Sequence, residues 1–468
     1  MASPHRFHPS VVRANDIRGV VGRTLAEADA YAIGGAVATI VAGKGETTVA
    51  IGRDGRTHSA SLMDAASRGV ADAGIKPLRI GLGPSPMLYF AVHHLNAGGG
   101  IMVTGSHNPP EYNGFKLMIG QQVIDAASMA ELVRIVEQND YASGSKPFED
   151  HSVRDAYIAA LRERAGNLGE RICGWDPGNG AVGALLKEVL DGLPGKHHAI
   201  NVAVDGRFPA HHPDPSEVKN LKDLQRLVAH EHCDVGFAFD GDGDRLGIID
   251  RKGRVVWPDQ YLALLARPIL KATPGASIIA DVKASDALFS TIEKAGGHPL
   301  MWKTGHAFIK RKLKETGAPL AGEMSGHVFF ADRWFGFDDA LYAALRILDA
   351  LQSEGIEMDA FLDSLPVKVN TPEIRIDCPD ELKFSIINEV HAAQKSALAD
   401  MIDIDGVRVK NADGWWLLRA SNTQPALVVR CEADDQAALS RVKRDLGRLL
   451  SRMGVDESPL FDGIEQAA

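Results

Sequence analysis

The segment Asp240-Gly241-Asp242-Gly243-Asp244-Arg245 carries three carboxylates at alternate positions, separated only by glycine. Three such groups repel one another unless a cation lies between them, and glycine lets the backbone fold around one hard ion. An EF-hand calcium loop needs glycine at its sixth position and glutamate at its twelfth, where this sequence has Arg245 and Arg251. Because few ligands are offered, the segment favours Mg²⁺ over Ca²⁺. A solvated acidic turn is the alternative.

A second segment, Thr104-Gly105-Ser106-His107-Asn108-Pro109, follows the apolar run 98–104. Ligands of open α/β sheets bind at the carboxyl ends of strands. Ser106 stands there beside a small glycine, a histidine and an asparagine, which suits a nucleophile that carries a phosphoryl group. Since Ser, Asn, Gly and Pro are also the commonest turn residues, an ordinary loop is the alternative.

Four further segments place cationic or polar side chains after strands or on loops, and each is weak evidence alone. Lys and Arg can neutralise phosphate charge, His can transfer protons near neutral pH, and Glu and Ser can hydrogen-bond to sugar hydroxyls. An ordinary surface loop is the alternative for each. The segments are Asp16-Ile17-Arg18-Gly19, Lys303-Thr304-Gly305-His306, Gly322-Glu323-Met324-Ser325-Gly326-His327 and Arg419-Ala420-Ser421-Asn422-Thr423-Gln424-Pro425.

The composition limits the class of protein that these segments belong to. A chain of 468 residues predicts about three or four domains. A net charge of -10 argues against nucleic acid as the main partner. The spacing of the four cysteines matches no metal or redox motif, which favours reduced, buried thiols. The polar N-terminus lacks a signal core, and the longest early apolar stretch is shorter than the roughly 20 residues of a membrane span. We therefore expect a cytoplasmic protein.

Short apolar runs alternate with helix-length segments through most of the chain, which is typical of parallel α/β sheets. Three such rounds are predicted, and a smaller antiparallel α+β unit follows them. The predicted helices are 27–43, 59–74, 126–138, 153–165, 180–190, 258–271, 285–295, 339–353, 380–398 and 434–453. The predicted strands are 47–53, 76–82, 98–104, 171–176, 198–205, 234–239, two within 247–256, 277–282, 298–303, 373–378, 407–410, 415–421 and 426–433. The expected domains are 1–152, 153–252, 253–366 and 367–468.

Taken together and in this order, the segments resemble those of the α-D-phosphohexomutase superfamily, over about residues 14–432. DIRG, TGSHNP, DGDGDR, GEMSGH and RASNTQP each stand where that family has a loop of its own, and DGRFP at 205–209 resembles its second domain. The resemblance implies an α/β fold of three similar mixed α/β domains followed by a smaller α+β C-terminal domain, arranged around a central active-site cleft.

The resemblance also implies a role for individual residues. Ser106 is the expected phosphoserine, and it is expected to hold Mg²⁺ together with Asp240, Asp242 and Asp244. Lys116 and Arg245 are expected to flank the reacting phosphoryl group. Arg18 and His306 complete the expected catalytic set, with His306 as the candidate general acid and base. The expected substrate-binding residues are Lys283, Glu323, Ser325, His327, Arg419, Ser421, Asn422 and Thr423.

Met324 and Asn422 make the sequence most similar to the bacterial phosphomannomutase/phosphoglucomutase group. This implies a reversible transfer of phosphate between O1 and O6 of mannose or glucose phosphates. Ser106 would pass its phosphoryl group to the sugar, form a 1,6-bisphosphosugar and recover the other phosphate, with glucose 1,6-bisphosphate or its mannose analogue as activator and intermediate. The expected partners are small phosphosugars, without nucleic acid or membrane, and the expected assembly is a monomer or a small homo-oligomer.

Three alternatives remain open at this point. A phosphoglucosamine mutase would use the same loops on an amino sugar. A non-catalytic phosphosugar-binding relative would have lost the serine or an aspartate, and all of these are present. A phosphatase or phosphotransferase with an aspartyl nucleophile would use Asp240 and Asp242 differently. Two departures from the group pattern are Asn15, where an aromatic residue is frequent, and Gly105 in place of the commoner alanine.

Overall fold

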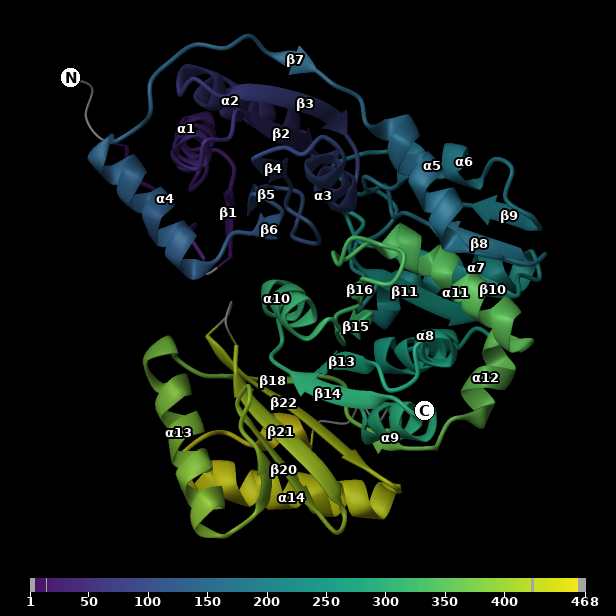
Figure 1. Ribbon diagram of the computed structural model, residues 1–468. Helices are drawn as coiled ribbons and strands as arrows, with labels where there is room; N and C mark the ends of the chain where they lie inside the picture. Colours follow the sequence, from purple (N-terminus) through teal and green to yellow (C-terminus); the bar gives the residue numbers. More distant parts are fainter. Residues whose placement is uncertain (1–4, 14, 422–424, 462–468) are drawn as a thin grey trace.

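The computed structural model describes residues 5–13, 15–421 and 425–461. Four β-sheets follow one another along the chain, and Figure 1 shows them as an arc that runs from purple to yellow, with the first and last units on the same side of the molecule. The expected fold class is confirmed, because three mixed sheets with helices precede one antiparallel sheet. None of the helices in the described ranges is both long and apolar enough to cross a membrane.

The first sheet has the order β1-β5-β4-β2-β3-β7, with β6 paired to β5. Strands β2, β3 and β4 are parallel, whereas β5 is antiparallel to its three partners, β1, β4 and β6. Successive strand residues face opposite sides, so Ile51 packs in the core of α1, α2 and α4 while Ala50 packs with α3. The elements are β1 (Asp16–Val20), α1 (Glu27–Gly43), β2 (Thr48–Arg53), α2 (Ser59–Asp72), β3 (Lys76–Leu82), α3 (Ser85–His94), β4 (Gly99–Val103), β5 (Tyr112–Ile119), β6 (Gln122–Val123), α4 (Ala126–Gln138) and β7 (Glu149–Asp150).

Helices α1 and α2 pack with their backbones in contact, which explains two glycines in the middle of these helices. A Cβ at Gly34 would lie 2.1 Å from the Ala66 carbonyl oxygen, and one at Gly69 would lie 2.1 Å from that of Tyr31. Any larger residue would therefore push the helices apart and withdraw their apolar faces from the sheet.

The second sheet, of order β12-β11-β10-β8-β9, and the third, of order β14-β13-β15-β16, share one apolar core that also takes in α3. Its second-sheet elements are α5 (Arg154–Ala165), β8 (Ile172–Asp176), α6 (Gly183–Leu190), β9 (Lys196–Ala199), α7 (Lys222–His230), β10 (Val235–Phe239), β11 (Leu246–Asp250) and β12 (Val255–Val256). The third unit contains α8 (Pro258–Ala272), β13 (Ser277–Asp281), α9 (Asp286–Lys294), β14 (His298–Trp302), α10 (His306–Thr316), β15 (Leu320–Gly322), β16 (Val328–Phe330), α11 (Ala340–Glu354) and α12 (Met358–Ser364).

The fourth sheet is antiparallel and has a core of its own, packed against α13 and α14. Polar contacts attach it to the third unit: the buried Arg408 donates to the Val282 and Ala284 carbonyls at 2.7 and 2.9 Å, and Arg430 donates to the Lys283 carbonyl at 2.7 Å. Its elements are β17 (Val369–Asn370), β18 (Ile374–Asp377), α13 (Asp380–Ser396), β19 (Asp400–Ile402), β20 (Val407–Asn411), β21 (Gly414–Ala420), β22 (Ala426–Ala433) and α14 (Gln436–Arg452).

One expected strand is wrong in its bounds. The strand predicted at 198–205 is β9, Lys196–Ala199, and the chain then leaves the sheet through Asn201, whose φ is +53°. The sequence patterns did not predict several short elements, among them α3, β5 and α10. The domain boundaries stay a proposal, to which the sheets add one constraint: β12 pairs with β11, so residues 253–256 belong with the second sheet.

Asp339 makes the packing of α11 against α5 depend on pH. Its carboxylate accepts hydrogen bonds from the Tyr342 amide at 3.0 Å and from the Tyr157 hydroxyl at 2.8 Å. Burial raises the pKa of Asp339 to about 7. Because the folded state holds this proton more tightly than the unfolded state, its stabilising contribution is lost as the pH rises from about 4 to about 7.

We expect Asp339→Asn to remove this dependence, since asparagine stays neutral and still accepts the Tyr342 amide as a helix cap. As the pH rises from about 5 to about 8, the free energy of unfolding of the variant relative to the wild type should increase by about 3 kcal/mol. Urea denaturation followed by circular dichroism measures the difference, with Asp223→Asn, at a half-buried aspartate of α7, as the control. Parallel pH profiles of wild type and Asp339→Asn would contradict the raised pKa.

Candidate active site

Ser106 lies in the loop between β4 and β5, in a conformation that few side chains adopt. Its φ is +48°, a left-handed value that costs a non-glycine residue about 1–3 kcal/mol. The Ser106 amide donates to the Thr104 hydroxyl at 2.8 Å, and the side chain is almost fully buried. Its hydroxyl donates to Asp240 Oδ2 at 2.7 Å and lies 3.1 Å from His107 Nδ1. The strain therefore points the hydroxyl of the first domain into the acidic loop of the second.

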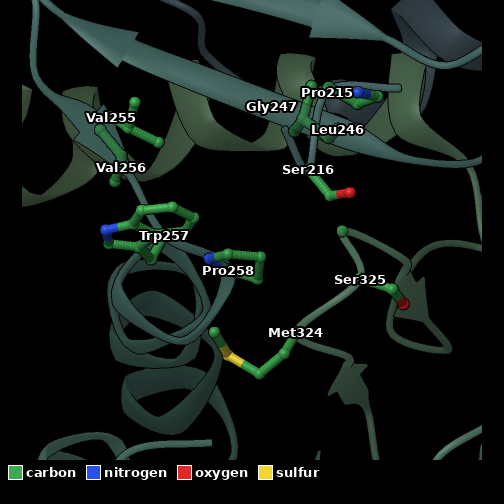
Figure 2. A pocket seen from close by; sticks show the side chains of 11 residues that line it. Pro215, Ser216, Leu246, Gly247, Val255, Val256, Trp257, Pro258, Met324 and Ser325 are labelled. Carbon is green, nitrogen blue, oxygen red and sulfur yellow. The ribbon is translucent and has the colours of Figure 1, made fainter. Parts of the chain in front are cut away.

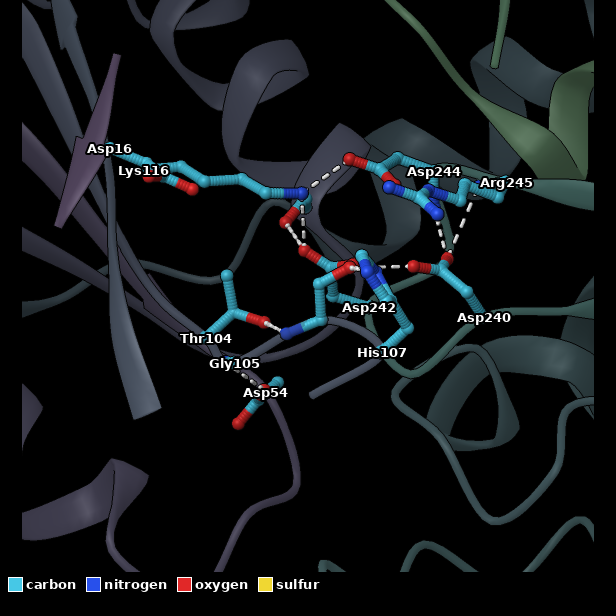
Figure 3. Close-up of polar contacts among 12 residues, drawn as sticks. Asp16, Asp54, Thr104, Gly105, His107, Lys116, Asp240, Asp242, Asp244 and Arg245 are labelled. Atoms are coloured by element: carbon cyan, nitrogen blue, oxygen red, sulfur yellow. Dashed lines mark hydrogen bonds and ion pairs between the residues drawn. The ribbon is translucent and has the colours of Figure 1, made fainter. Parts of the chain in front are cut away.

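Asp240, Asp242 and Asp244 leave β10 in a tight loop that lies against the serine loop (Figure 3). One carboxylate oxygen from each lies within 4.8 Å of the others, and all three residues are buried. Asp242 Oδ1 and Asp244 Oδ1 have no hydrogen-bond partner within the described ranges. Two orphaned carboxylate oxygens in a buried cluster are the ligands that a hard divalent cation takes, so this set fits Mg²⁺.

Lys116 of β5 reaches across the domain junction to this cluster. Its ammonium donates to Asp242 Oδ2 at 2.6 Å and also to Asp244 Oδ2. Burial alone would lower the pKa of Lys116, but the two aspartates outweigh it and hold the pKa well above its usual value. Burial beside the other two carboxylates raises the pKa of Asp240, the member of the set that Lys116 does not contact. Three ionised carboxylates against the single ammonium of Lys116 leave two negative charges, which a divalent cation would balance.

Arg245 and His327 form the next part of the site. Arg245 Nε donates to His327 Nε2 at 3.1 Å, and His327 Nδ1 lies 2.9 Å from Asp338 Oδ2. Because an arginine Nε–H can only donate, His327 Nε2 is the acceptor of this bond, and Nδ1 is the ring nitrogen that faces Asp338. Burial would raise the pKa of Asp338, but Lys310 at 2.6 Å and His327 hold it well below its usual value. A buried carboxylate thus orients His327.

His306 stacks on the His327 ring, with 5.8 Å between the ring centroids. It begins α10 directly after β14 and lies 3.9 Å from Asp338. Burial, and then the charge of Lys310, hold the pKa of His306 well below its usual value. His306 is therefore neutral at physiological pH in the absence of a ligand.

Arg18 of β1 approaches the serine loop from its other side. Arg18 Nε donates to Asp16 Oδ2 at 2.6 Å, and its Nη1 donates to the Asn108 side chain. It is therefore close to the Ser106 loop without touching the serine hydroxyl within the described contacts.

The loop from β15 to β16 carries Glu323, Ser325 and His327. Glu323 Oε1 accepts the Gly305 amide at 2.5 Å, which ties this loop to the start of α10, and burial raises the pKa of its carboxyl group. Figure 2 shows Met324 extending toward Trp257 and Pro258 at the start of α8, whereas Ser325 extends to the other side of the loop. Besides His327, the loop thus offers the polar side chains of Glu323 and Ser325, and Met324 anchors it.

Arg419 and Lys283 lie at the junction of the third and fourth units, each beside a carboxylate. Arg419 is 3.1 Å from Asp405, which also accepts the Thr304 amide at 3.0 Å. Lys283 donates to Glu373 at 3.1 Å and lowers the pKa of Glu373 to about 2. Arg419 and Lys283 can therefore accept an anion only by sharing or exchanging these partners.

The predicted residues thus come together along one line of contacts from all four units: the serine loop, the aspartate loop, the two stacked histidines, the loop from β15 to β16, and Arg419. Ser421 directly follows β21, and its carbonyl accepts Lys383 at 2.7 Å. Asn422 and Thr423 lie outside the described residues. Sequence reasoning missed Asp338, Ser85 and Lys310. Ser85 donates to Asp242 at 2.5 Å. The only sequence signal for Asp338 is its place in FGFDDA, before a long apolar helix.

Family models match nearly the whole chain in four consecutive parts. Residues 10–143, 155–253 and 257–369 match the phosphoglucomutase/phosphomannomutase alpha/beta/alpha domains I, II and III. Residues 373–448 match the phosphoglucomutase/phosphomannomutase C-terminal domain.

Similar proteins cover almost the same length. The phosphomannomutase/phosphoglucomutase of Pseudomonas aeruginosa is 42% identical over 434 residues, 93% of this chain and 94% of that protein. The phosphoglucomutase of Neisseria gonorrhoeae is 43% identical over 446 residues, 92% of this chain and 95% of its own. The crystal structure of a phosphoglucomutase/phosphomannomutase family protein from Burkholderia thailandensis is 39% identical and covers 96% of this chain and 99% of its own, with a TM-score of 0.91. The chain belongs to the phosphoglucomutase/phosphomannomutase family and is a hexose-phosphate mutase of that family.

Proposed function

We propose that the chain moves phosphate reversibly between O1 and O6 of mannose or glucose phosphates through phospho-Ser106 and a 1,6-bisphosphosugar. The observation that carries the proposal is the contact of the Ser106 hydroxyl with Asp240, inside a carboxylate cluster that Lys116 partly neutralises. A serine that only donated a structural hydrogen bond would not need a left-handed backbone beside three buried acids. A serine that stores a phosphoryl group needs that surplus of cation-binding oxygens.

In the first step, the free hydroxyl oxygen of the sugar attacks phosphorus and the Ser106 Oγ–P bond breaks. The hydroxyl proton passes to a base, the departing Ser106 Oγ takes up a proton, and the product is a 1,6-bisphosphosugar with free Ser106. After reorientation, Ser106 Oγ attacks the other phosphorus and gives its proton to the base, and the sugar oxygen leaves with a proton. Lys116 and Arg245 are the proposed partners of the transferring phosphoryl group, because phosphoryl transfer depends chiefly on charge neutralisation and in-line positioning.

Asp240, Asp242, Asp244 and phospho-Ser106 are the proposed ligands of Mg²⁺. The ion would supply charge neutralisation on the phosphoryl oxygens. Aspergillus fumigatus N-acetylphosphoglucosamine mutase, a protein of the same fold at 14–15% identity, was crystallised with GlcNAc-6P and magnesium and, as a serine-to-alanine variant, with glucose 1,6-bisphosphate. Together with the acidic cluster, this supports a metal cofactor and glucose 1,6-bisphosphate, or its mannose analogue, as activator.

The geometry favours His327 over His306 as the proton acceptor. His327 has the groups of a general base: a carboxylate faces Nδ1, and Nε2 is an acceptor, which would exchange its bond from Arg245 Nε for the sugar hydroxyl. His306, the residue that the sequence favoured, lacks so close a carboxylate and stacks on His327. We therefore propose that His306 shapes the pocket around His327. Arg18 is proposed to lie near the phosphoryl group that is transferred.

Glu323 and Ser325 are the proposed partners of the sugar hydroxyls, and Lys283, Arg419, Ser421, Asn422 and Thr423 those of the phosphate that does not react. The non-reacting phosphate would exchange with the carboxylates of Asp405 and Glu373 that now pair with Arg419 and Lys283. Because the residues that bind the non-reacting phosphate can take either phosphate of the intermediate, one site can serve both of its orientations.

We expect Ser106→Ala to lower mutase activity at least about 1,000-fold, because the variant loses the proposed carrier of the phosphoryl group. A coupled assay with glucose 1-phosphate, primed with glucose 1,6-bisphosphate, measures the loss. Ser61→Ala, at an exposed serine of α2, is the matched control and should keep full activity. A Ser106→Ala enzyme that turns over at the wild-type rate would exclude the phosphoserine mechanism.

The same assay with mannose 1-phosphate and glucosamine 1-phosphate tests the substrate class. We expect turnover of the mannose and glucose phosphates, in line with the names of the relatives at 42–43% identity. Activity confined to the amino sugar would make the chain a phosphoglucosamine mutase instead.

We expect Mg²⁺ to raise the melting temperature of the metal-free protein, because a ligand of the folded state stabilises it by about 2.7 kcal/mol at 100 times its Kd. Asp242→Asn should abolish this shift, and Asp223→Asn on α7 should keep it. Thermal scans in EDTA and in Mg²⁺ give the comparison. Equal shifts in wild type and Asp242→Asn would place the ion elsewhere.

We expect His327→Gln to lower kcat by about 100-fold or more at an unchanged KM, the range of a lost general base. His306→Gln should lower kcat less, since His306 contacts the base and not the transferred proton. Steady-state kinetics with saturating bisphosphate measure both. A larger loss in His306→Gln than in His327→Gln would reverse the assignment.

A further inference from the structure

Arg56 hydrogen-bonds to the backbone along the loop that carries Ser106. It lies between β2 and α2 and is only 2% exposed. Its Nη2 donates to the carbonyls of Ser106 and Asn108 at 2.7 and 2.5 Å, and its Nη1 donates to those of Pro109 and Tyr112 at 2.6 and 2.9 Å. Both terminal nitrogens of the guanidinium are therefore fully used, and all four acceptors are backbone atoms of the serine loop or of the first residue of β5.

The guanidinium is itself fixed from two sides. Asp54 accepts the Arg56 amide at 3.0 Å, accepts the Gly105 amide at 3.2 Å, and lies 3.4 Å from Arg56 Nε. Phe208, from the second domain, places its ring 5.0 Å from the Arg56 guanidinium, a cation–π contact. The grip thus involves both domains whose junction carries Ser106 and Asp240.

The serine loop needs these hydrogen bonds because the backbone of its central residue, Ser106, is strained. Ser106 sits at a φ of +48°, and backbone in that region persists only when its surroundings over-determine it. Left alone, the peptide would relax and turn the hydroxyl away from Asp240. Lysine could not replace Arg56, because one ammonium cannot reach four carbonyls that require a planar fork.

We propose that Arg56 is a positioning residue, which holds the Ser106 loop in the geometry for phosphoryl transfer without contacting the serine hydroxyl. This inference rests on the proposed function of Ser106. During turnover Ser106 gains and loses a phosphoryl group, and its peptide must keep one orientation in both states. The four hydrogen bonds from Arg56 to the backbone fix this orientation whatever the charge on the Ser106 side chain.

Arg346 offers a matched control for a test. It is also 2% exposed, pairs with Asp332 at 2.8 and 2.9 Å, and packs on Phe330 and Tyr342 in the third unit. Arg346→Lys therefore removes a buried guanidinium at the same burial and tests the general cost of doing so. Any effect that Arg56→Lys has beyond it belongs to the serine loop.

The experiment compares wild type, Arg56→Lys and Arg346→Lys in full-length enzyme by kinetics with glucose 1-phosphate and by hydrogen exchange. We expect Arg56→Lys to lower kcat about 100-fold, the effect of an ångström-scale misplacement, with KM within about threefold. Amides of residues 104–112 should exchange faster in Arg56→Lys only. Arg346→Lys should keep kcat while losing thermal stability.

An unchanged kcat, or unchanged exchange at 104–112, in Arg56→Lys would overturn the proposal. If Arg56→Lys does not fold, Asp54→Asn loosens the same grip and should act in the same direction with a smaller loss; wild-type values there would overturn the proposal as well. A wild type without mutase activity would instead refute the proposed function, and the exchange comparison would still decide whether Arg56 holds the loop.

Discussion

Charge balance around three buried aspartates is the constraint on which the rest of the active site depends. Asp240, Asp242 and Asp244 are shielded from water, where unpaired carboxylates are costly. Their nearest cation, Lys116, comes from the first sheet, whereas the aspartates come from the second. The ion pairs therefore tie two domains together and set where Ser106 can stand. Removing one partner of such a pair typically costs about 3–5 kcal/mol, so site and domain junction are maintained together.

The molecule joins its parts with different kinds of interface at the two ends of the site. The second and third sheets share one apolar core with α3, which keeps the serine, aspartate and histidine loops in register. The fourth unit has a separate core and meets the third through buried arginines, ion pairs and a small apolar cluster around Trp415. Polar contacts can exchange partners at lower cost than a packed core can open. The part that carries Ser106 and the aspartates is thus joined by a packed core, and the fourth unit is the part whose contacts a ligand can replace.

The sequence predicted the site best where the residues that carry the chemistry lie next to one another in the chain. The aspartate triplet and the serine hexapeptide are local motifs at strand ends, and the fold brings them within hydrogen-bond distance. It predicted the site poorly where a side chain contacts a residue outside its own local motif. Arg56, 50 residues before Ser106, and Asp338, 11 residues after His327, are ordinary in their local context. Short elements such as α3 and β5 were missed for a related reason: their apolar residues are buried on all sides and leave no periodicity.

The sequence by itself determined the family, the order of the four units and the chemical class of the site, because these depend on residue types and on the short spacings that place them on one loop. Only the tertiary structure decided which groups neutralise the aspartates, that His327 and not His306 has the close carboxylate, and that Arg56 holds the serine loop. Such pairings arise between segments that the chain brings together from different sheets. Their energies depend on burial and on distances of a few ångströms, and neither quantity exists until the four sheets have packed.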